Sequence, residues 1–333
     1  MDIVCLGELI LDMFASETGK DFFSVAAFIP VAGGAPANVA VAAAKLGARS
    51  SFIGKVGEDP FGRRMERVLR EHGVETRGMR FDPEHRTTLN FMTLPDPNRT
   101  EMLFYRNPGA DMMLEPLELD RVLIESAAAY HFGSVSLAVE PCRSAALEGA
   151  RLARAAGALV SFDVNYRPGL WPGEDKARAE IRAALPLADI VKVNETELRL
   201  LTGTDAAPAG CAAMLKAGPG LCVATLGPHG SAWAAAGSRG GATKTSGSVA
   251  GFRVDAVDAT GCGDAFVAAL LVKLIGMSGK ADGARRGRLE TLSAADMTAA
   301  LRYANAAGAF TALKKGVMNA LPSDRDVQAL LKG

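Results

Sequence analysis

The stretch Asp258-Ala-Thr-Gly-Cys-Gly-Asp264 determines how the rest of the 333-residue sequence is interpreted. An alternating segment, residues 251–257, precedes it, and an apolar run, residues 265–275, follows it; this pattern predicts a strand, a glycine turn and a helix. Glycines let backbone N–H groups close around an anion, and the positive end of a helix attracts the same anion. Asp264 in the first turn would accept a proton beside that anion, which is the arrangement that phosphoryl transfer requires.

An ordinary strand-to-helix turn with an acidic first-turn residue is the alternative interpretation of this stretch. Two other phosphate motifs are excluded. No Gly-Lys pair in the sequence is followed by Ser or Thr, so the P-loop signature is absent. The run Gly261-Cys-Gly-Asp-Ala-Phe266 lacks the third glycine of the dinucleotide fingerprint, which argues against a nicotinamide enzyme.

The composition is that of a large globular α/β protein, with 49% apolar and 22% charged residues. Lys plus Arg equals Asp plus Glu at 37 each, so the chain has no net basic field for nucleic acid. The five cysteines are scattered without a Cys-x-x-Cys pair, as in a reduced protein, and the four histidines show no metal-ligand spacing. With no charged leader and no apolar stretch of membrane-spanning length, we expect a cytoplasmic protein that binds neither nucleic acid nor membranes.

Short apolar runs alternate with amphipathic segments along most of the chain. Strands are expected at residues 3–7, 51–56, 130–137, 159–164, 190–193 and 221–226. Helices are expected at residues 39–46, 60–72, 117–127, 140–156, 174–186, 206–217, 265–275 and 301–311. This alternation predicts the α/β class, with a doubly wound, mostly parallel sheet flanked by helices in a single domain, residues 1–333.

Two segments interrupt the alternation. Residues 87–94 and 101–106 are rich in β-forming residues and are joined by residues 95–98, which predicts a hairpin. Together with an irregular stretch at about residues 12–32, the segment at about 86–107 would build a small separate sheet. Inserted between βα units, this sheet would act as a lid that excludes water from the site.

Polar residues gather where the expected strands end, which is where open α/β sheets bind ligands. Asp12 follows the first strand, and Asn38 lies one turn into the helix that follows Gly33-Gly-Ala-Pro-Ala-Asn38. Paired glycines let a ligand touch the backbone, and an amide side chain offers both a donor and an acceptor to a hydroxyl-rich molecule. Three further polar stretches, residues 163–167, 192–197 and 225–230, follow other strands.

With these pieces in place, the sequence resembles the ribokinase-like (PfkB) sugar kinases over nearly its whole length, and most closely the fructokinases. The two family signatures correspond to residues 33–38 and 258–264, in the family's order and at about its usual spacing; Cys262 stands where most members have Ala. Residues 104–111, 140–144 and 314–322 are fructokinase-like. The resemblance favours the phosphate-binding interpretation of the turn. It also implies a β-sheet lid, which forms a homodimer interface in many members.

The resemblance implies roles for the matching residues. Asp264 would be the catalytic base, and Gly261, Cys262 and Gly263 would supply amides to an anion hole. Sugar-binding positions are matched by Asp12, Gly33, Gly34 and Asn38. ATP-binding positions are matched by Lys192, Asn194, Thr225, Gly227, Gly230 and Asn305, besides the glycines of the anion hole. Magnesium would be positioned through water by Asn194 and Glu197, and a monovalent cation such as K⁺ by Asp258 and Thr260.

The implied activity is transfer of the γ-phosphoryl group of ATP to a sugar hydroxyl, with D-fructose converted to fructose 6-phosphate. Residues 163–171 also resemble 2-keto-3-deoxygluconate kinases, so that sugar acid is the alternative substrate. Arg106 and Arg167 would suit its carboxylate by bidentate pairing, but they would equally suit a neutral sugar or loop-stabilising salt bridges. A non-catalytic sugar or nucleotide sensor is the third possibility, which the retention of Asp264 and both glycines disfavours.

Overall fold

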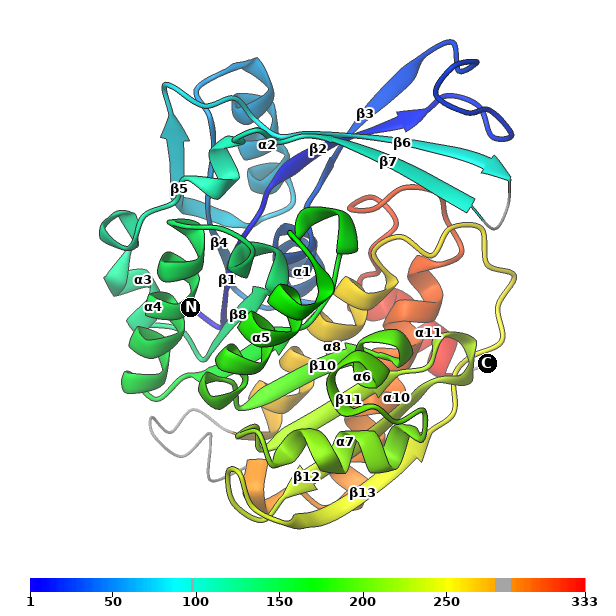
Figure 1. Cartoon of the computed structure of the whole chain (residues 1–333). Helices are drawn as coiled ribbons and strands as arrows, with labels where there is room; N and C mark the ends of the chain where they lie inside the picture. Colours follow the sequence, from blue (N-terminus) through cyan, green and yellow to red (C-terminus); the bar gives the residue numbers. More distant parts are fainter. Residues whose placement is uncertain (97–98, 279–288, 333) are drawn as a thin grey trace.

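The computed structural model describes residues 1–96, 99–278 and 289–332, and within them nine strands form the larger of two sheets (Figure 1). Their order is β13-β12-β11-β10-β9-β8-β1-β4-β5. In chain order these strands are β1 (Ile3–Leu6), β4 (Ser50–Gly57), β5 (Glu75–Asp82), β8 (Ala129–Gly133), β9 (Leu159–Asp163), β10 (Ile190–Asn194), β11 (Leu221–Thr225), β12 (Ser231–Ala236) and β13 (Thr243–Val249).

In the large sheet, neighbouring strands from β5 to β11 pair parallel. Strand β12 pairs antiparallel with both β11 and β13. The helices are α1 (Ala35–Lys45), α2 (Pro60–Glu71), α3 (Arg121–Glu125), α4 (Cys142–Ala155), α5 (Glu174–Ala184), α6 (Glu195–Thr202), α7 (Ala207–Leu215), α8 (Cys262–Ser278), α10 (Ala294–Thr311) and α11 (Asp324–Lys332). The predicted α/β class and the mostly parallel sheet flanked by helices are confirmed.

Both faces of the large sheet are buried. Ile3 and Cys5 of β1 enter a core shared with α1, α8 and α10, while Val4 and Leu6 enter a second core shared with α4, α5 and α7. Successive side chains of a strand point to opposite faces, so a strand covered on both sides needs an unbroken apolar run. This explains why most of the parallel strands were recognisable in the sequence.

Four strands form the smaller sheet, in the order β3-β2-β6-β7. They are β2 (Ile10–Ala15), β3 (Phe28–Gly33), β6 (Leu89–Asp96) and β7 (Arg99–Tyr105). The sheet extends away from the large one at the top of Figure 1. Strands β6 and β7 pair antiparallel, which confirms the predicted hairpin, although residues 97–98 of its expected turn lie outside the described residues.

The strand predicted at residues 251–257 is wrong. The segment is irregular, and the backbone N–H groups of Val257 and Asp258 donate to the Ala312 carbonyl at 2.7 and 3.2 Å. The end of α10 therefore holds this segment, in place of a neighbouring strand. Strands β5, β12 and β13 and helices α6 and α11 were not predicted.

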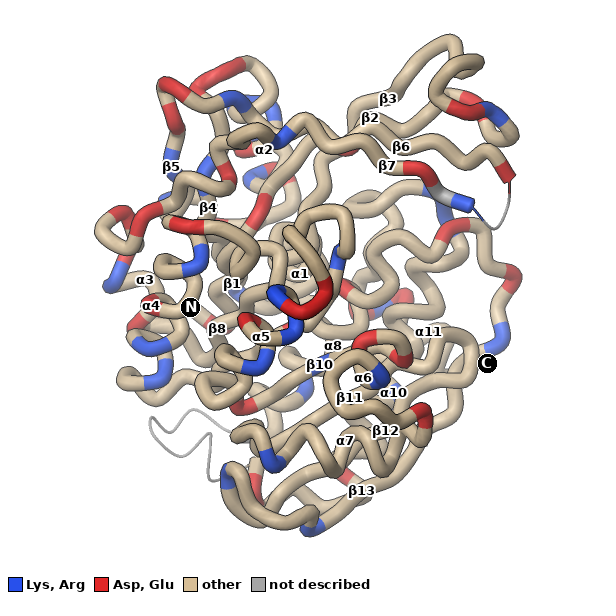
Figure 2. Tube along the Cα trace, viewed as in Figure 1, with Lys and Arg blue, Asp and Glu red and all other residues tan. Residues whose placement is uncertain are grey.

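Acidic and basic residues are interspersed along both sheets and their helices (Figure 2). Among the residues that the structure describes, no helix combines the length and the apolar character needed to cross a membrane.

Candidate active site

The glycine turn before α8 adopts the conformation that its sequence predicts. Gly261 has φ +80°, in the left-handed region that favours glycine. Gly263 and Asp264 lie in the first turn of α8, where backbone N–H groups have no acceptor within the helix. The N–H of Cys262 donates to the Ala259 carbonyl at 3.3 Å. The N-terminal end of α8 thus presents backbone donors beside a carboxylate.

Asp264 and Asn38 bring the two signature stretches together. Asn38 Nδ2 on α1 donates to Asp264 Oδ2 at 2.8 Å, and both residues are buried. Burial raises the pKa of Asp264 to about 6; Asp163 adds to the rise, while the Asn38 hydrogen bond and the charges of Lys192 and Arg167 oppose it. A carboxylate whose pKa lies nearer neutrality is a better proton acceptor at neutral pH.

A buried lysine stands beside this turn. Lys192 Nζ on β10 lies 3.1 Å from Asp163 Oδ1 at the end of β9. A Cβ atom placed on Gly263 would lie 3.3 Å from Lys192 Nζ, so the ammonium group and the turn are neighbours. Asp163 was not among the predicted site residues, although its place at a strand end, in a stretch already singled out, was the signal.

The small sheet contributes a second carboxylate. Asn90 Nδ2 on β6 donates to Asp12 Oδ1 on β2 at 2.8 Å. Burial raises the pKa of Asp12 to about 6, against the hydrogen bond from Asn90 and the charge of Arg167. A Cβ atom on Gly33 would lie 2.0 Å from Asp12 Oδ2, so a side chain there would displace the Asp12 carboxylate. Gly34, at φ +110°, precedes the first residue of α1.

Two amide oxygens at this site are buried without a hydrogen-bond partner among the described residues, Asn38 Oδ1 and Asn90 Oδ1. Buried polar atoms are normally paired, because an unpaired one costs about 1–3 kcal/mol. A ligand rich in hydroxyl groups would satisfy both acceptors. Asn90 was missed in the sequence because a single Asn in a β-rich run has no distinguishing signal.

The two arginine candidates occupy different surroundings. Arg106 is 7% exposed and forms an ion pair with Asp111, with Nη2 2.7 Å from Oδ2. Arg167 is exposed and donates to the Tyr166 carbonyl at 3.3 Å. The charge of Arg167 lowers the pKa of both Asp12 and Asp264, so its guanidinium lies near the site.

The Asn-x-x-Glu motif forms the capping box of α6. Asn194 N donates to Glu197 Oε2 at 2.7 Å, and Glu197 N donates to Asn194 Oδ1 at 2.9 Å. Glu197 Oε1 also accepts from Tyr166 N at 2.8 Å, which connects α6 to the loop after β9. In the described part of the chain, no three His, Cys, Asp or Glu side chains are grouped to bind a metal. The Glu197 carboxylate and the Asn194 amide oxygen therefore serve here as acceptors for backbone N–H groups.

The predicted nucleotide loop and helix α10 both approach the same backbone segment, residues 249–250. Gly227 and Gly230 have φ +54° and +99°, and a Cβ atom on Gly230 would lie 2.1 Å from the Val249 carbonyl oxygen. Asn305 Nδ2 donates to the carbonyls of Val249 and Ala250 at 3.2 Å each. Thr225 Oγ1, at the end of β11, donates to the Val193 carbonyl at 3.3 Å.

Asp258 joins two segments that are far apart in the sequence. Its Oδ1 accepts from Thr260 N and Oγ1 at 2.9 and 2.6 Å, and its Oδ2 accepts from Gly316 N at 3.2 Å. The segments of the expected cation site therefore lie together. Burial raises the pKa of the Cys262 thiol to about 12, so this thiol stays protonated.

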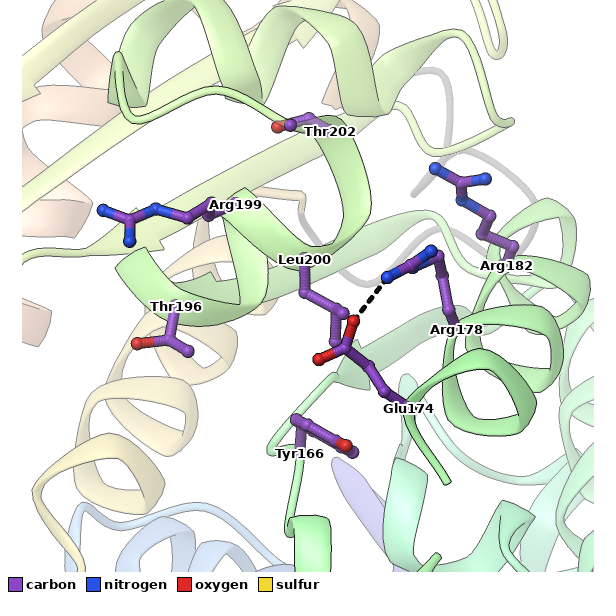
Figure 3. A pocket seen from close by; sticks show the side chains of 9 residues that line it. Tyr166, Glu174, Arg178, Arg182, Thr196, Arg199, Leu200 and Thr202 are labelled. Carbon is purple, nitrogen blue, oxygen red and sulfur yellow. Dashed lines mark hydrogen bonds and ion pairs between the residues drawn. The ribbon is translucent and has the colours of Figure 1, made fainter. Parts of the chain in front are cut away.

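A cavity of about 510 Å³ lies outside this constellation, against α5 and α6 (Figure 3). Its basic side chains already have partners: Arg178 pairs with Glu174 at 2.5 Å, and Arg182 donates to the Leu201 carbonyl at 2.7 Å. None of the predicted site residues lines it. The predicted site residues therefore lie outside the lining of this cavity.

Fructokinases are among the known proteins that resemble this chain in sequence and in fold. The chain is 43% identical over 332 residues to a probable fructokinase-4 of Arabidopsis thaliana, covering 99% of this chain and 97% of the relative. A fructokinase from Xylella fastidiosa with bound ATP superposes with a TM-score of 0.87 at 33% identity, covering 99% of this chain and 98% of the other.

Another solved structure is a fructokinase from Vibrio cholerae O395 in a form with fructose, ADP and calcium ion bound. It superposes with a TM-score of 0.82 at 32% identity, covering 99% of this chain and 98% of the other. A double mutant of the same enzyme, with the same TM-score, identity and coverage, has fructose, ADP and potassium ion bound.

The family model described as pfkB family carbohydrate kinase matches residues 1–324. Both glycine-rich signatures, Asp12, Asp264 and Lys192 lie within this range. The chain therefore belongs to the pfkB family of carbohydrate kinases, phosphotransferases that act on a sugar hydroxyl.

Proposed function

We propose that this chain is an ATP-dependent fructokinase that transfers the γ-phosphoryl group of ATP to D-fructose, giving fructose 6-phosphate. The observation that carries the proposal is the buried Asp264 carboxylate, held by Asn38 at 2.8 Å beside the glycine turn and near Lys192. A proton acceptor and an anion-binding turn in one place suit phosphoryl transfer. D-fructose is chosen as the sugar because the similar proteins named above are fructokinases.

Each group has a distinct task in this mechanism. Asp264 takes the proton of the attacking sugar hydroxyl. The amides of the turn and the ammonium of Lys192 stabilise the negative charge on the phosphoryl group as it moves. Asp12 and Asn38 hold other hydroxyls of the sugar, and the unpaired Asn90 oxygen provides a further acceptor.

The surroundings of Arg106 favour a neutral ketose over a sugar acid. Its guanidinium is already neutralised by Asp111, so a buried substrate carboxylate would have to compete with an internal ion pair. Arg167 is the observation in favour of the acid, because it is exposed and faces Asp12 and Asp264. An unpaired carboxylate in a closed site is costly, so one arginine would have to carry the whole charge.

Magnesium and a monovalent cation complete the proposal. Glu197 and Asn194 would hold magnesium through water. Their side-chain oxygens already accept backbone N–H groups, so only their remaining lone pairs would bind the water molecules around the metal. Bound there, the metal would offset the phosphate charge. Asp258 and Thr260, with carbonyls near Gly316, would hold K⁺. Replacing K⁺ by a tetraalkylammonium ion should lower kcat if this cation site is used.

The small sheet would act as the lid and would form a homodimer. Asn90 faces Asp12, so the neighbouring Phe91 and its cross-strand partner Leu103 lie on the other face. Phe91 packs edge-on against Tyr105 at 5.4 Å, and Leu103 and Tyr105 are exposed. A second copy of this chain would cover this apolar face, and a Leu103→Glu variant should then sediment as a monomer.

The cysteines are unpaired, which suits a protein of the reducing cytoplasm.

The test is ATP turnover by the purified protein with D-fructose, 2-keto-3-deoxygluconate, D-ribose or no sugar. We expect kcat/KM for fructose to exceed that for the sugar acid by at least about tenfold, a difference of about 1.4 kcal/mol in transition-state binding. A preference for the acid would overturn the substrate and leave the Asp264 chemistry standing. Binding without any turnover would support the sensor alternative.

A further inference from the structure

The four strands of the small sheet all meet the rest of the molecule at one place. Strand β2 begins two residues after Glu8, and β3 ends two residues before Ala35. Strand β6 begins directly after Thr88, and β7 ends directly before Arg106. Any rotation of the small sheet relative to the large one has to pass through these four crossings.

Asp111 connects two of the crossings through short buried contacts. Arg106 donates from Nε and Nη2 to Asp111 Oδ2 at 2.8 and 2.7 Å. Thr88 Oγ1 donates to Asp111 Oδ1 at 2.5 Å. Arg106, Asp111 and Thr88 are 7%, 2% and 1% exposed. The start of β6 and the end of β7 are therefore tied to the same carboxylate, away from solvent.

Glu8 connects the other two crossings. Its Oε1 accepts from Ala35 N at 3.1 Å, at the start of α1. Burial raises the pKa of Glu8 to about 7, and the positive charge of Arg106 opposes this rise. The Arg106 guanidinium is thus attracted by the charge of Glu8, from the β1–β2 loop, as well as by Asp111, which it contacts directly.

Thr88, Arg106 and Asp111 pack closely around Gly109. A Cβ atom on Gly109 would lie 1.9 Å from Thr88 Oγ1, 2.8 Å from Asp111 Oδ1 and 3.2 Å from Arg106 Cγ. A close-packed group that joins four chain crossings fixes their relative positions, because packed interiors transmit strain. Asn90 lies only two residues beyond Thr88, and Asp12 lies four residues beyond Glu8.

We propose that Glu8, Thr88, Arg106 and Asp111 form a hinge cluster that sets the position of the small sheet, and with it Asp12 and Asn90, over Asp264. Arg106 is then a positioning residue and does not bind sugar. The inference rests on the proposed function, because it requires that the small sheet holds the sugar. A displacement of about 1 Å at a reacting site costs up to about 10²-fold in rate.

The test is a double-mutant cycle on Arg106→Gln and Asp111→Asn, measured with the sugar that the wild-type enzyme phosphorylates best. Each single variant should lower kcat/KM for sugar by about 10- to 100-fold, mainly through KM, while KM for ATP stays unchanged. The double variant should be no worse than the worse single variant, since both act on one cluster. If Asp111→Asn keeps the wild-type sugar KM, or if the two losses multiply, Arg106 acts by itself and the proposal fails.

A matched control separates positioning from stability. Asp189 is also buried in an ion pair, 3.0 Å from Arg239, but it lies directly before β10, at the end of the strand opposite to Asn194. Asp189→Asn should lower Tm without changing KM for sugar. Thr88→Val removes one hydrogen bond with little change of shape and should raise the sugar KM, whereas Thr88→Ser should restore it. Equal sugar KM values in the Val and Ser variants would contradict the hinge cluster.

A measurement without sugar keeps this test distinct from the proposed function. Amide hydrogen exchange in residues 89–96 of the unliganded protein should be faster in Asp111→Asn than in the wild type or in Asp189→Asn. Unchanged exchange in all three proteins would overturn the hinge cluster. A wild-type protein that phosphorylates no sugar would instead overturn the proposed function and leave this comparison intact.

Discussion

The two sheets of the molecule differ in how firmly they are held. The large sheet is covered on both faces, and the side chains of its parallel strands enter two separate cores. The small sheet leaves Ile29, Met102, Leu103 and Tyr105 exposed. Regions with few buried apolar contacts are the ones that open and move most easily. In the proposed mechanism, the phosphate chemistry rests on the rigid sheet, and sugar recognition depends on the sheet with more freedom.

This division gives a rule that mutations can break. Changes beside the large sheet, at the turn before α8, should act on kcat. Changes on the small sheet, at β2 and β6, should act on KM for sugar. A change at the turn before α8 that acted mainly on KM for sugar, or a change at β2 or β6 that acted mainly on kcat, would contradict this division.

The largest effect is expected for Asp264→Asn. The variant keeps the shape and the hydrogen bond to Asn38 but removes the proton acceptor, and general-base catalysis contributes about 10²–10⁴-fold. We expect kcat to fall by that factor while calorimetry shows ATP and sugar still binding. Retention of more than about a tenth of the wild-type kcat would exclude Asp264 as the base.

A smaller loss is expected for Gly263→Val. The new side chain would enter the space beside Lys192 Nζ, which lies 3.3 Å from a Cβ at this position. The side chain would keep the phosphoryl group away from an amide donor; losing one donor to a developing anion costs about 10²–10³-fold in rate, and kcat should fall accordingly. Thermal unfolding is the control. A variant with wild-type Tm and wild-type kcat would mean that the glycine serves only the turn.

On the small sheet, Asp12→Ala should raise KM for fructose by about tenfold or more and change kcat less. The carboxylate supplies an acceptor for a sugar hydroxyl, and its loss also leaves Asn90 without the partner it has at 2.8 Å. Arg167→Gln is the matched comparison, because that side chain is exposed and faces the same site. A larger effect from Arg167→Gln than from Asp12→Ala would favour the sugar acid as substrate.

The last effect concerns stability and leaves the rates aside. Burial raises the pKa of Asp264 from 3.8 to about 6, so the charged carboxylate destabilises the folded state. This destabilisation appears as the pH rises from about 4 to about 6 and is fully present above that range. Asp264→Asn should therefore increase the free energy of unfolding by up to about 3 kcal/mol at neutral pH, and the gain should vanish near pH 4. Equal increases in the free energy of unfolding at both pH values would mean that the charge of Asp264 does not cause the stabilisation.

Much of the fold was predictable because buried parallel strands have continuous apolar sequences. Ile190–Asn194 and Leu221–Thr225 are clear examples, and both were expected from the sequence. Strand β12, Ser231–Ala236, was not, because its Ala-rich sequence is typical of a helix. Its pairing with β11 and β13 overrides that preference. Strand β5, Glu75–Asp82, is an edge strand with mixed charges and has no clear alternation.

The candidate site was predictable where a motif marks it. Asp264 and Asn38 lie in glycine-rich signatures, and the structure joins them directly. Asn90 has no such motif, and Asp163 was marked only by its place in a polar stretch at a strand end; tertiary pairing brings them to Asp12 and Lys192. Arg106 had a motif but no visible partner, since Asp111 approaches it only after the chain turns back at residues 107–110.

The central claim, that Asp264 is the base, is tested most directly by the pH dependence of kcat at saturating sugar and ATP. With the pKa of Asp264 at about 6, the base becomes protonated below that pH, so wild-type kcat should fall as the pH drops from about 8 to about 5. The residual kcat of Asp264→Asn should be flat over the same range. A fall with the same midpoint in the Asn variant would show that another group carries the proton and would contradict the account.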